Sequence, residues 1–439
     1  LHTDVYPPDL YPLRRNRTTA ALKQAIQQYR PLSADAPRLK EPQPAAGEWL
    51  LSVGPVHAAV IEPGRFLFRL GGEMIEEVGI QLGYTHKGIE RLFQVDRALE
   101  NGWQLAEHVS GDSSFAHSMA YCQAVENLAR IQIPPQAILL RGLFLEFERL
   151  ANHIGDCGAL ARDVAMDMAA SEMAALREKV LRLNLHATGH RLLRGVNRPG
   201  GVQLPGTLDI EKIAKTIAEI DTAFTFLGRQ VQQKPGFRDR AINTGILTRQ
   251  QAANLGATGL AARASGLERD FRLRHPFGIY QDAAFRQIIR RQSLPLEATA
   301  GDVFARFLIR WYEAQTSAIV IRKILAHLKK TAGQQTSFTT PIEFRRIQNY
   351  EFGLGYVEGW RGDIVYWLMK DKFQGIYRCK ARDPSTLNWA ALKAALNPHP
   401  LDNEYIERHK APQRAVETII ADFPIVNKSF NLSYSGNDL

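Results

Sequence analysis

The chain has 439 residues, of which 45% are hydrophobic and 23% are charged. This composition is typical of a folded globular protein and excludes a disordered chain, and no stretch reaches the roughly 18 consecutive apolar residues of a membrane span. The formal net charge of +10 is compatible with nucleic acid, an anionic membrane surface or acidic partner subunits. Nucleic acid is disfavoured, because the basic residues are spread along the chain and form no zinc-finger, RNP or basic-zipper pattern.

The three cysteines, Cys122, Cys157 and Cys379, are far apart and form no CxxC pair. Their odd number and spacing predict a reducing compartment and buried thiols without a disulfide framework. We therefore expect no metal cluster ligated by cysteines of this chain. The first residues contain no apolar core, so no signal peptide is expected. The absence of an initial Met indicates that the sequence follows processing or begins inside a longer product.

The N-terminal part of the chain predicts an extension followed by a β-hairpin. Residues 1–49 form the extension, with a short helix that ends at Tyr29 and a proline-containing linker after it. Over residues 50–82, Phe66 and Phe68 alternate along one strand, and a Gly-Gly pair separates it from a second strand.

From Gly83 onward the pattern becomes helical. Ser114 is expected to cap one helix, and Pro134–Pro135 to begin a long one. Apolar residues at helical spacing predict further long helices over about 165–194, 208–233 and 301–331. The predicted fold is α+β and mainly α, a central bundle of long helices with small antiparallel β elements in the N-terminal and C-terminal parts. Residues 50–439 form one domain.

Short sequence blocks occur in a characteristic order along residues 50–439. They are Gly54-Pro55-Val56-His57, Gly83-Tyr84-Thr85-His86-Lys87-Gly88-Ile89-Glu90, Ser114-Phe115-Ala116-His117-Ser118, Glu146 to His153, Gly200-Gly201-Val202, Glu358-Gly359-Trp360-Arg361-Gly362 and Arg382-Asp383-Pro384-Ser385. This order resembles the large subunit of group 4 (energy-converting) nickel–iron hydrogenases and its relative in complex I, the forty-nine-kilodalton, D-type subunit of NADH-quinone oxidoreductase. The resemblance implies a hydrogenase large-subunit-like fold.

The metal ligands of the hydrogenases that the chain resembles are two CxxC pairs. The positions that match the first pair are Ser110 and Ser113, and those that match the second are Ser433 and Gly436. A serine hydroxyl is a poor ligand for a soft metal and glycine has no side chain. We therefore expect no metal in this chain.

The quinone contacts of the complex I relatives are also changed. A histidine after the Gly-Pro-x-His turn and a tyrosine before the Phe-Ala-His block match Ile61 and Gly111, whose side chains form no hydrogen bonds. A histidine near the terminal iron–sulfur cluster matches Leu193. The acceptor is therefore either a quinone held in an unusual pose or another small molecule.

The resemblance implies a set of site residues that remain polar. The catalytic candidates are Glu90, His57, Asp112 and Arg361. The candidates for cofactor binding are His57, His117, Arg361 and Asp383. Glu90 matches the position that passes protons to the hydrogenase metal site, Arg361 matches the arginine beside the diatomic ligands, and Asp112 lies between the two serines of the first ligand pair.

Four of these residues also have a structural interpretation. Glu90 could form an ion pair with Lys87 or Arg91, and His57 could be a solvent-exposed turn residue. His117 could be a hydrogen-bonded core histidine, and Arg361 could hold its loop through a salt bridge. In addition, Glu146, Arg149, His153 and Asp156 share one stripe of an apolar helix, which predicts either a proton relay or a structural ion-pair network, with the network favoured.

The function implied by the resemblance is that of a redox-complex subunit, inactive alone and without hydrogenase activity. It would pack against a B-type small subunit that holds a [4Fe–4S] cluster, and quinone is the one cofactor that it could bind itself. Other expected partners are a thirty-kilodalton, C-type protein, whose tail resembles Pro8 to Arg15, a ferredoxin-like subunit and antiporter-like membrane subunits that move ions. The expected location is the cytoplasmic face of the inner membrane. The alternative is a non-catalytic scaffold subunit of such a complex.

Overall fold

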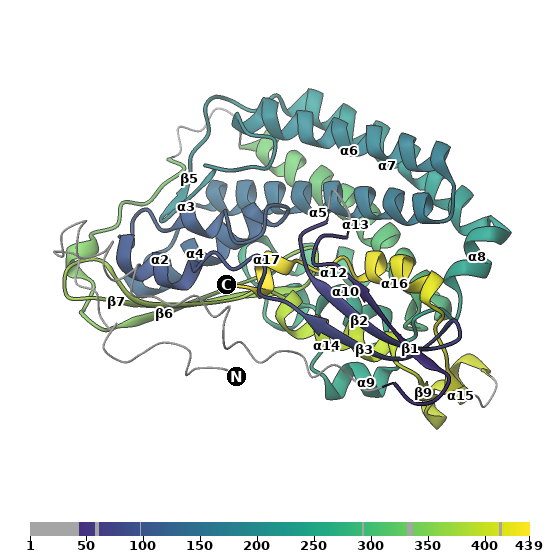
Figure 1. Cartoon of the computed structure of the whole chain (residues 1–439). Helices are drawn as coiled ribbons and strands as arrows, with labels where there is room; N and C mark the ends of the chain where they lie inside the picture. The colour runs from purple at the N-terminus through teal and green to yellow at the C-terminus, as the bar shows by residue number, and fades with distance from the viewer. Residues whose placement is uncertain (1–43, 58–60, 97, 292–293, 332–336, 412–414) are drawn as a thin grey trace.

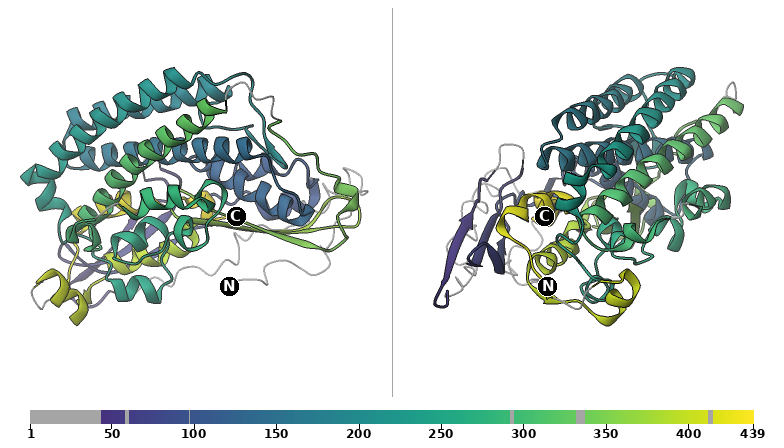
Figure 2. Two further views of the ribbon diagram at one scale, coloured as in Figure 1. Left: turned by 180° about the vertical axis from the view of Figure 1, so that it is seen from behind. Right: turned by 90° about the vertical axis from the view of Figure 1, so that its right-hand side faces the viewer.

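Four long helices form one bundle in the structure, a computed structural model that describes residues 44–439 apart from 58–60, 97, 292–293, 332–336 and 412–414. The four helices are α5 (Pro135–Asp163), α6 (Asp167–Thr188), α7 (Ile210–Gln233) and α13 (Val303–Lys330). α5 packs between α6 and α13, and α7 contacts the same two helices (Figures 1 and 2). The predicted central bundle is therefore confirmed. The helix predicted to end at Tyr29 lies outside the described residues.

The ends of these helices follow from the local sequence. Pro135 occupies the first turn of α5, where its missing N–H removes no helical hydrogen bond. Asp209 and Asp302 cap α7 and α13, because each carboxylate accepts a backbone N–H of the first turn. α6 ends at Thr188, earlier than the predicted end near residue 194. Gly189 takes a left-handed conformation (φ 78°) and terminates the helix.

The N-terminal sheet contains the predicted hairpin and one additional strand. β2 (Arg65–Gly71) and β3 (Met74–Gln81) pair antiparallel, and β1 (Glu48–Val53) pairs with the other edge of β2. The alternating Phe66 and Phe68 are fully buried. β1 has no comparable alternation of apolar residues, so it carries only a weak strand signal.

The C-terminal sheet is formed by β6 (Phe352–Glu358), β7 (Asp363–Lys370) and β8 (Ile376–Arg382), which pair antiparallel in chain order. α4 (Ser114–Ala129) lies against β6, and the side chains of Gln123 and Asn127 form hydrogen bonds with the backbone of β6. Gly355 permits this close approach, because a Cβ atom there would lie 2.0 Å from the carbonyl oxygen of Ala120. The strand edge is thereby covered by a helix.

The last helices of the chain return to its N-terminal part. α14 (Ser385–Leu396) packs on β3, on α16 (Phe423–Phe430) and on α17 (Tyr434–Asn437). The carboxylate of Asp438 accepts hydrogen bonds from the backbone N–H groups of Gly83 and Thr85 and from the Thr85 hydroxyl. The C-terminal residues are therefore held beside the segment that follows the N-terminal sheet.

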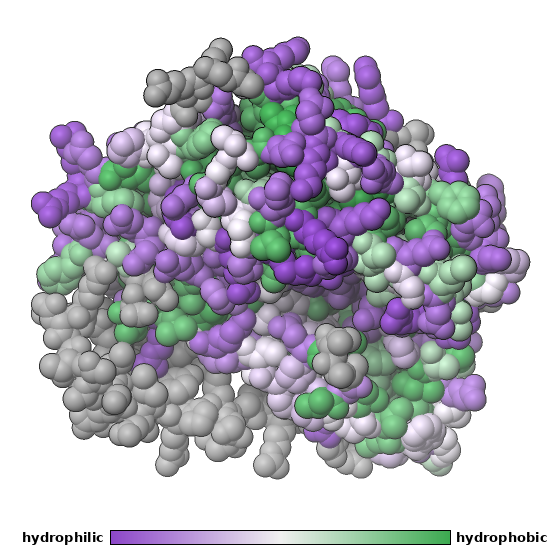
Figure 3. Space-filling view, turned by 90° about the horizontal axis from the view of Figure 1, so that it is seen from above, coloured by the Kyte–Doolittle hydropathy of each residue, from purple (hydrophilic) through white to green (hydrophobic). Residues whose placement is uncertain are grey.

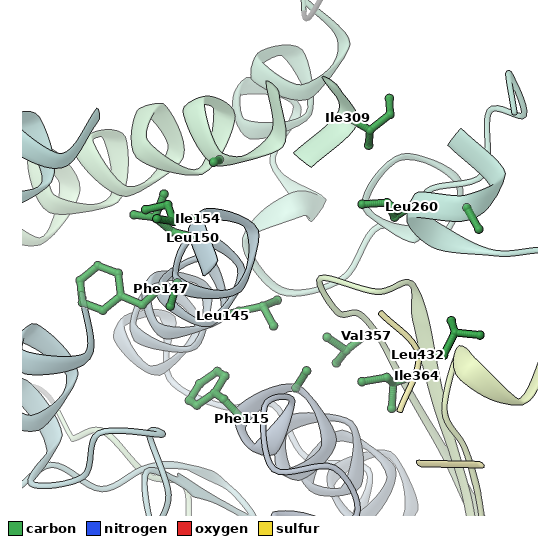
Figure 4. Close-up of a cluster of buried hydrophobic side chains, with 14 of the residues drawn as sticks. Phe115, Leu145, Phe147, Leu150, Ile154, Leu260, Ile309, Val357, Ile364 and Leu432 are labelled. Atoms are coloured by element: carbon green, nitrogen blue, oxygen red, sulfur yellow. The ribbon is translucent and has the colours of Figure 1, made fainter. Parts of the chain in front are cut away.

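The hydrophobic core continues from the bundle to the C-terminal sheet. Figure 4 shows the side chains of Phe115, Leu145 and Val357 in the space between α4, α5 and β6, and each of them is at most 1% exposed. The helix face seen in Figure 3 carries many hydrophilic side chains with smaller hydrophobic groups among them. Within the described residues, no helix has the length and apolar character needed to cross a membrane.

Shorter elements connect these layers. They are α2 (Ile89–Asp96), α3 (Trp103–Ala106), β4 (Asn197–Arg198), β5 (Gly201–Val202), α8 (Pro235–Ala241), α9 (Arg249–Asn254), α10 (Gly259–Ala264), α11 (Phe271–Arg274), α12 (Ala283–Arg290), β9 (His399–Pro400), α15 (Asn403–His409) and β10 (Ala415–Val416).

The contact between α4 and β6 gives a test of the fold. Substitution Gly355→Ala should lower the free energy of unfolding by about 1–3 kcal/mol, because the added methyl group overlaps backbone atoms that cannot move independently. The substitution Gly206→Ala is the control, since a Cβ at this exposed position meets no atom within 4 Å. Thermal unfolding of both variants measures the difference, and equal melting temperatures would contradict the described packing.

Candidate functional site

The four positions that match hydrogenase metal ligands lie together in the structure, although the two pairs are about 320 residues apart. The hydroxyl oxygen of Ser110 lies 2.9 Å from that of Ser433, and Gly436 donates its backbone N–H to Ser433 Oγ at 2.9 Å. Ser113 lies at the start of α4, and its hydroxyl accepts from Arg361 at 3.4 Å. We call Ser110, Ser113 and Ser433 the serine cluster, and each is at most 3% exposed.

Asp112 and Arg361 form the charged part of this site. Two nitrogens of the guanidinium donate to the two carboxylate oxygens, both at 2.6 Å, and Nε donates to the carbonyl oxygen of Asn431. The guanidinium also stacks over the Trp360 ring, whose indole N–H donates to the Asp112 carbonyl oxygen. Burial raises the pKa of Asp112, but the charge and hydrogen bonds of Arg361 outweigh it and hold the pKa below its ordinary value. Both side chains are therefore charged and their loops are fixed.

His117 and Asp383 form a second buried pair beside the serine cluster. His117 Nε2 lies 3.0 Å from Asp383 Oδ2, and its Nδ1 lies 3.0 Å from the hydroxyl of Tyr366. Asp383 also accepts the backbone N–H of Ser385, as expected for a turn. The hydrogen bond and charge of His117 overcome the effect of burial and lower the pKa of Asp383. Both ring nitrogens of His117 are used, which agrees with the hydrogen-bonded core histidine.

Glu90 and His57 are held by other contacts. Glu90 forms an ion pair with Lys380 of β8, rather than the predicted pair with Lys87 or Arg91, and its side chain is 23% exposed. His57 lies 3.3 Å from the Tyr434 hydroxyl and packs edge-on against Phe66. Burial and the nearby charge of Lys428 lower the pKa of His57. His57 is partly buried, so the solvent-exposed alternative is wrong.

Two carboxylates that position the site were not among the predicted residues. Glu148 of α5 accepts the backbone N–H groups of Phe115 and Ala116 at 2.7 and 3.1 Å, so it caps α4. The predicted cap was wrong, since the Ser114 hydroxyl donates to the Gly111 carbonyl oxygen instead. Burial raises the pKa of Glu148 to about 8. Its position within the Glu146-to-His153 block was the only signal in the sequence.

Glu62 is the second of these carboxylates. It accepts the backbone N–H groups of Tyr434 and Ser435 at 3.0 and 3.1 Å, and so it holds the start of α17. This contact fixes the segment that carries Ser433 and Gly436.

An open hollow of about 620 Å³ lies on the surface next to this site. Its lining residues are Trp103, Gln104, Leu105, Glu107, His108, His190, Arg194 and Gly195. Glu107 accepts the Gly195 backbone N–H at 2.7 Å, and burial raises its pKa to about 7. Arg194 reaches the Ser114 hydroxyl at 3.5 Å, which connects the hollow to the start of α4.

A family model described as "Respiratory-chain NADH dehydrogenase, 49 Kd subunit" matches residues 163–406, more than half of the chain. The chain belongs to this family. Its predicted resemblance to this kind of subunit and to group 4 hydrogenases is thereby confirmed, since relatives of both kinds match it.

Relatives of this family member occur in both kinds of complex. Hydrogenase-4 component G and formate hydrogenlyase subunit 5 of Escherichia coli are each 28% identical and align with 90% of this chain. The chain spans 64% and 66% of their lengths. The D 1 subunit of NADH-quinone oxidoreductase from Roseiflexus sp. (strain RS-1) is 28% identical over 79% of this chain and 91% of its own length.

A solved structure confirms the fold of the family. A chain of the membrane-bound sulfane sulfur reductase, an archaeal respiratory membrane complex, superposes with a TM-score of 0.76 at 21% identity. The superposition covers 90% of this chain and 99% of that chain.

The residues present at the ligand positions do not fit a nickel–iron centre. Two serine hydroxyls touch each other directly, and a hydroxyl does not supply the soft thiolate that such a centre requires. A side chain at Gly436 would begin 2.6 Å from Asp383 Cγ. In the described part of the chain, no group of three or more His, Cys, Asp or Glu side chains could hold a metal ion.

The Arg361–Asp112 pair can be tested by substitution. Arg361→Ala should lower the free energy of unfolding by about 2–3 kcal/mol, because it leaves a carboxylate without its charged donor. The cost stays below that of a fully buried pair because the Asp112 side chain is 34% exposed. Arg249→Ala, which removes an exposed pair with Glu404, is the control and should have little effect. Denaturant unfolding compares them, and equal losses would contradict this assignment.

Proposed function

We propose that this chain is the large subunit of a membrane-associated redox complex and that it works without nickel. The observation that carries the proposal is the replacement of the cysteines at the positions that match the hydrogenase metal ligands. Hydroxyl-to-hydroxyl contacts and the Arg361–Asp112 pair take the place of ligands there. The complex would be related to energy-converting hydrogenases and to NADH-quinone oxidoreductase, and it would lack hydrogenase activity.

The hollow beside the serine cluster is the proposed contact with an iron–sulfur small subunit. His108, His190 and Arg194 line it, and Arg194 carries positive charge. Side chains of this kind suit the negative charge of a [4Fe–4S] cluster that is ligated by the partner's cysteines. Electrons from that cluster would reach a small acceptor, quinone or another molecule, near Asp112 and Arg361. Because Ile61 and Gly111 offer no side-chain hydrogen bond, a quinone would be held in a different way from that in complex I relatives.

The proposed partners include further subunits of the same kind of complex. A thirty-kilodalton, C-type protein, a ferredoxin-like subunit and antiporter-like membrane subunits complete it, with this chain in the peripheral arm on the cytoplasmic face of the inner membrane. Glu90, His57, Asp112 and Arg361 are the proposed catalytic residues. His57, His117, Arg361 and Asp383 are the groups that would contact a bound acceptor.

A second candidate is a scaffold subunit that couples its neighbours without redox chemistry of its own. The direct contact between Ser110 and Ser433 favours it, because the space between these positions is closed. Every hydroxyl of the serine cluster has a partner within the chain, which is what a purely structural core would contain.

Purification of the native complex separates the two candidates. The redox-subunit proposal predicts iron without nickel in the metal analysis, together with reduction of a quinone analogue or another small acceptor. Arg361→Lys and Glu90→Gln should each reduce turnover at least about tenfold with assembly intact, since both are proposed catalytic residues. A tenfold loss corresponds to about 1.4 kcal/mol of activation free energy. Full turnover in both variants would favour the scaffold, and one nickel per complex would overturn the nickel-free proposal.

The proposed small-subunit contact gives a further prediction. His108→Glu places a negative charge at an exposed position of the hollow. It should reduce recovery of the iron–sulfur subunit about tenfold, through repulsion and lost complementarity. Lys215→Glu, a charge reversal at an exposed position of α7, should leave recovery unchanged. Iron content of the affinity-purified complex measures the effect. Equal iron in both variants would place the small subunit elsewhere.

A further inference from the structure

A second cluster of charged groups lies in the core, next to the turn that ends in Arg361. It connects α5, the α10–α11 region, α13 and β6. Its members are the carboxyl groups of Glu146, Asp270, Glu313 and Glu358, the guanidinium groups of Arg149, Arg263 and Arg272, and the imidazole of His153. The four carboxyl residues are at most 5% exposed. Three of these eight residues belong to the stripe predicted on α5.

Glu313 lies at the centre of this buried cluster. It accepts from Arg263 Nε at 2.6 Å and from His153 Nε2 at 3.1 Å, and it lies within 3.8 Å of Arg149 and Arg272. Although burial opposes ionisation, the charge of Arg263 and the hydrogen bond of His153 hold the pKa of Glu313 well below its ordinary value. Glu313 is therefore ionised, and the surrounding guanidinium groups stabilise its negative charge.

Glu146 and Asp270 are also well supplied with donors. Glu146 accepts from Arg149 at 3.3 Å and from the hydroxyls of Tyr280 and Ser317. Arg272 donates to both oxygens of Asp270, the shortest distance being 2.7 Å. In each case burial raises the pKa, but the charge of the neighbouring arginine brings it below its ordinary value.

Glu358 has the poorest environment for a negative charge. It accepts from Arg263 Nη1 at 2.7 Å and from the Phe271 backbone N–H at 3.1 Å, while Arg263 is already engaged by Glu313. Asp270 and Asp363 add negative charge nearby. Asp363 forms an ion pair with Arg382 of β8, and the positive charge of Arg269 also stabilises its carboxylate. Burial and the charge of Asp270 raise the pKa of Glu358 to about 7.

The charges of the cluster do not balance when every carboxyl group is ionised. Among the described residues in direct contact, four carboxyl groups face three guanidinium groups. His153 donates through Nε2 to an ionised carboxylate, its Nδ1 has no hydrogen-bond partner, and burial lowers its pKa, so its ring is neutral. One unbalanced negative charge in a buried site is costly, and a bound proton removes that cost.

We propose that this cluster is a buried proton-binding site that takes up and releases one proton near neutral pH, with Glu358 as the carrier. Nδ1 of His153 has no hydrogen-bond partner, but burial lowers the pKa of this ring, so the proton resides on Glu358. The alternative interpretation, a purely structural ion-pair network, requires no group in it to change its protonation between pH 5 and pH 9.

The position of Glu358 connects this proton site to the serine cluster. Glu358 and Arg361 lie three residues apart, at the two ends of one turn. Arg149 fixes that turn by donating to the carbonyl oxygens of Glu358 and Gly359 at 2.6 and 3.0 Å. The ring of Trp360 packs edge-on against His153. A negative charge that arrives beside Arg361 would raise the proton affinity of Glu358, and this coupling, but not the proton site itself, rests on the proposed function.

The proton site is tested by infrared spectroscopy on the full chain at a series of pH values. A protonated carboxylic acid gives a C=O band, sensitive to exchange into D₂O, that should lose amplitude as pH rises through about 7. Glu358→Gln should remove that part of the band, whereas Glu211→Gln, at an exposed position on α7, should not change it. An unchanged band in Glu358→Gln would overturn the proposal.

The pH dependence of unfolding gives a second test. The folded chain binds the Glu358 proton up to pH about 7, and the unfolded chain binds it only up to about pH 4.3. Stability therefore falls as pH rises between these values, by up to about tenfold in the folding equilibrium per pH unit. Glu358→Gln should lose this slope relative to the wild type, and parallel curves would contradict the assignment.

A third variant keeps Glu358 in place if Glu358→Gln fails to fold. Asp363→Asn removes a negative neighbour and should shift the infrared titration to lower pH, because the Glu358 anion is then less destabilised. An unshifted titration would overturn the proposal. None of these measurements requires turnover, so they can fail while the redox-subunit proposal stands, and the reverse also holds.

Discussion

The need to satisfy buried charges on α5 constrains the whole structure. Arg149, 0% exposed, is held by carboxylates and by the carbonyl oxygens of the turn that ends in Arg361. Farther along the helix, Asp156 receives Arg310 of α13 at 2.8 Å and the amide of Asn431 at 2.7 Å. An unpaired charge at any of these positions would cost several kcal/mol, so α13, β6 and the C-terminal segment have one permitted placement each around α5.

The serine cluster shows how a polar site can persist after its metal ligands are replaced. Hydroxyl groups satisfy one another where thiolates would require a cation, and the Arg361–Asp112 pair brings both signs of charge to the same place. An arginine without its carboxylate would leave positive charge beside the serines. The carboxylate of Asp112 thus neutralises the positive charge of Arg361, which a bound anion would otherwise have to do.

The long elements of this protein were more predictable than its local contacts. The long helices and the hairpin followed from apolar spacing, from Pro135 and from the Gly-Gly turn, because these signals act over short sequence distances. The convergence of Ser110 with Ser433 came only from the family resemblance. No local pattern encodes contacts such as Glu148 with the start of α4 or Glu90 with Lys380, since they depend on how separate elements pack. Gly189 was a local signal for the early end of α6, but the prediction followed the apolar spacing, which continues past it.

The bonds between Asp438 and the Gly83–Thr85 turn are among the longest-range contacts in the sequence of this fold. Contacts between residues some 350 positions apart close a very large loop, and the entropy lost on closing it must be offset by other contacts of the folded chain. The serine cluster, whose halves are almost as far apart, depends on the same kind of long-range closure. The geometry of the serine cluster is therefore a property of the whole folded chain and not of either segment alone.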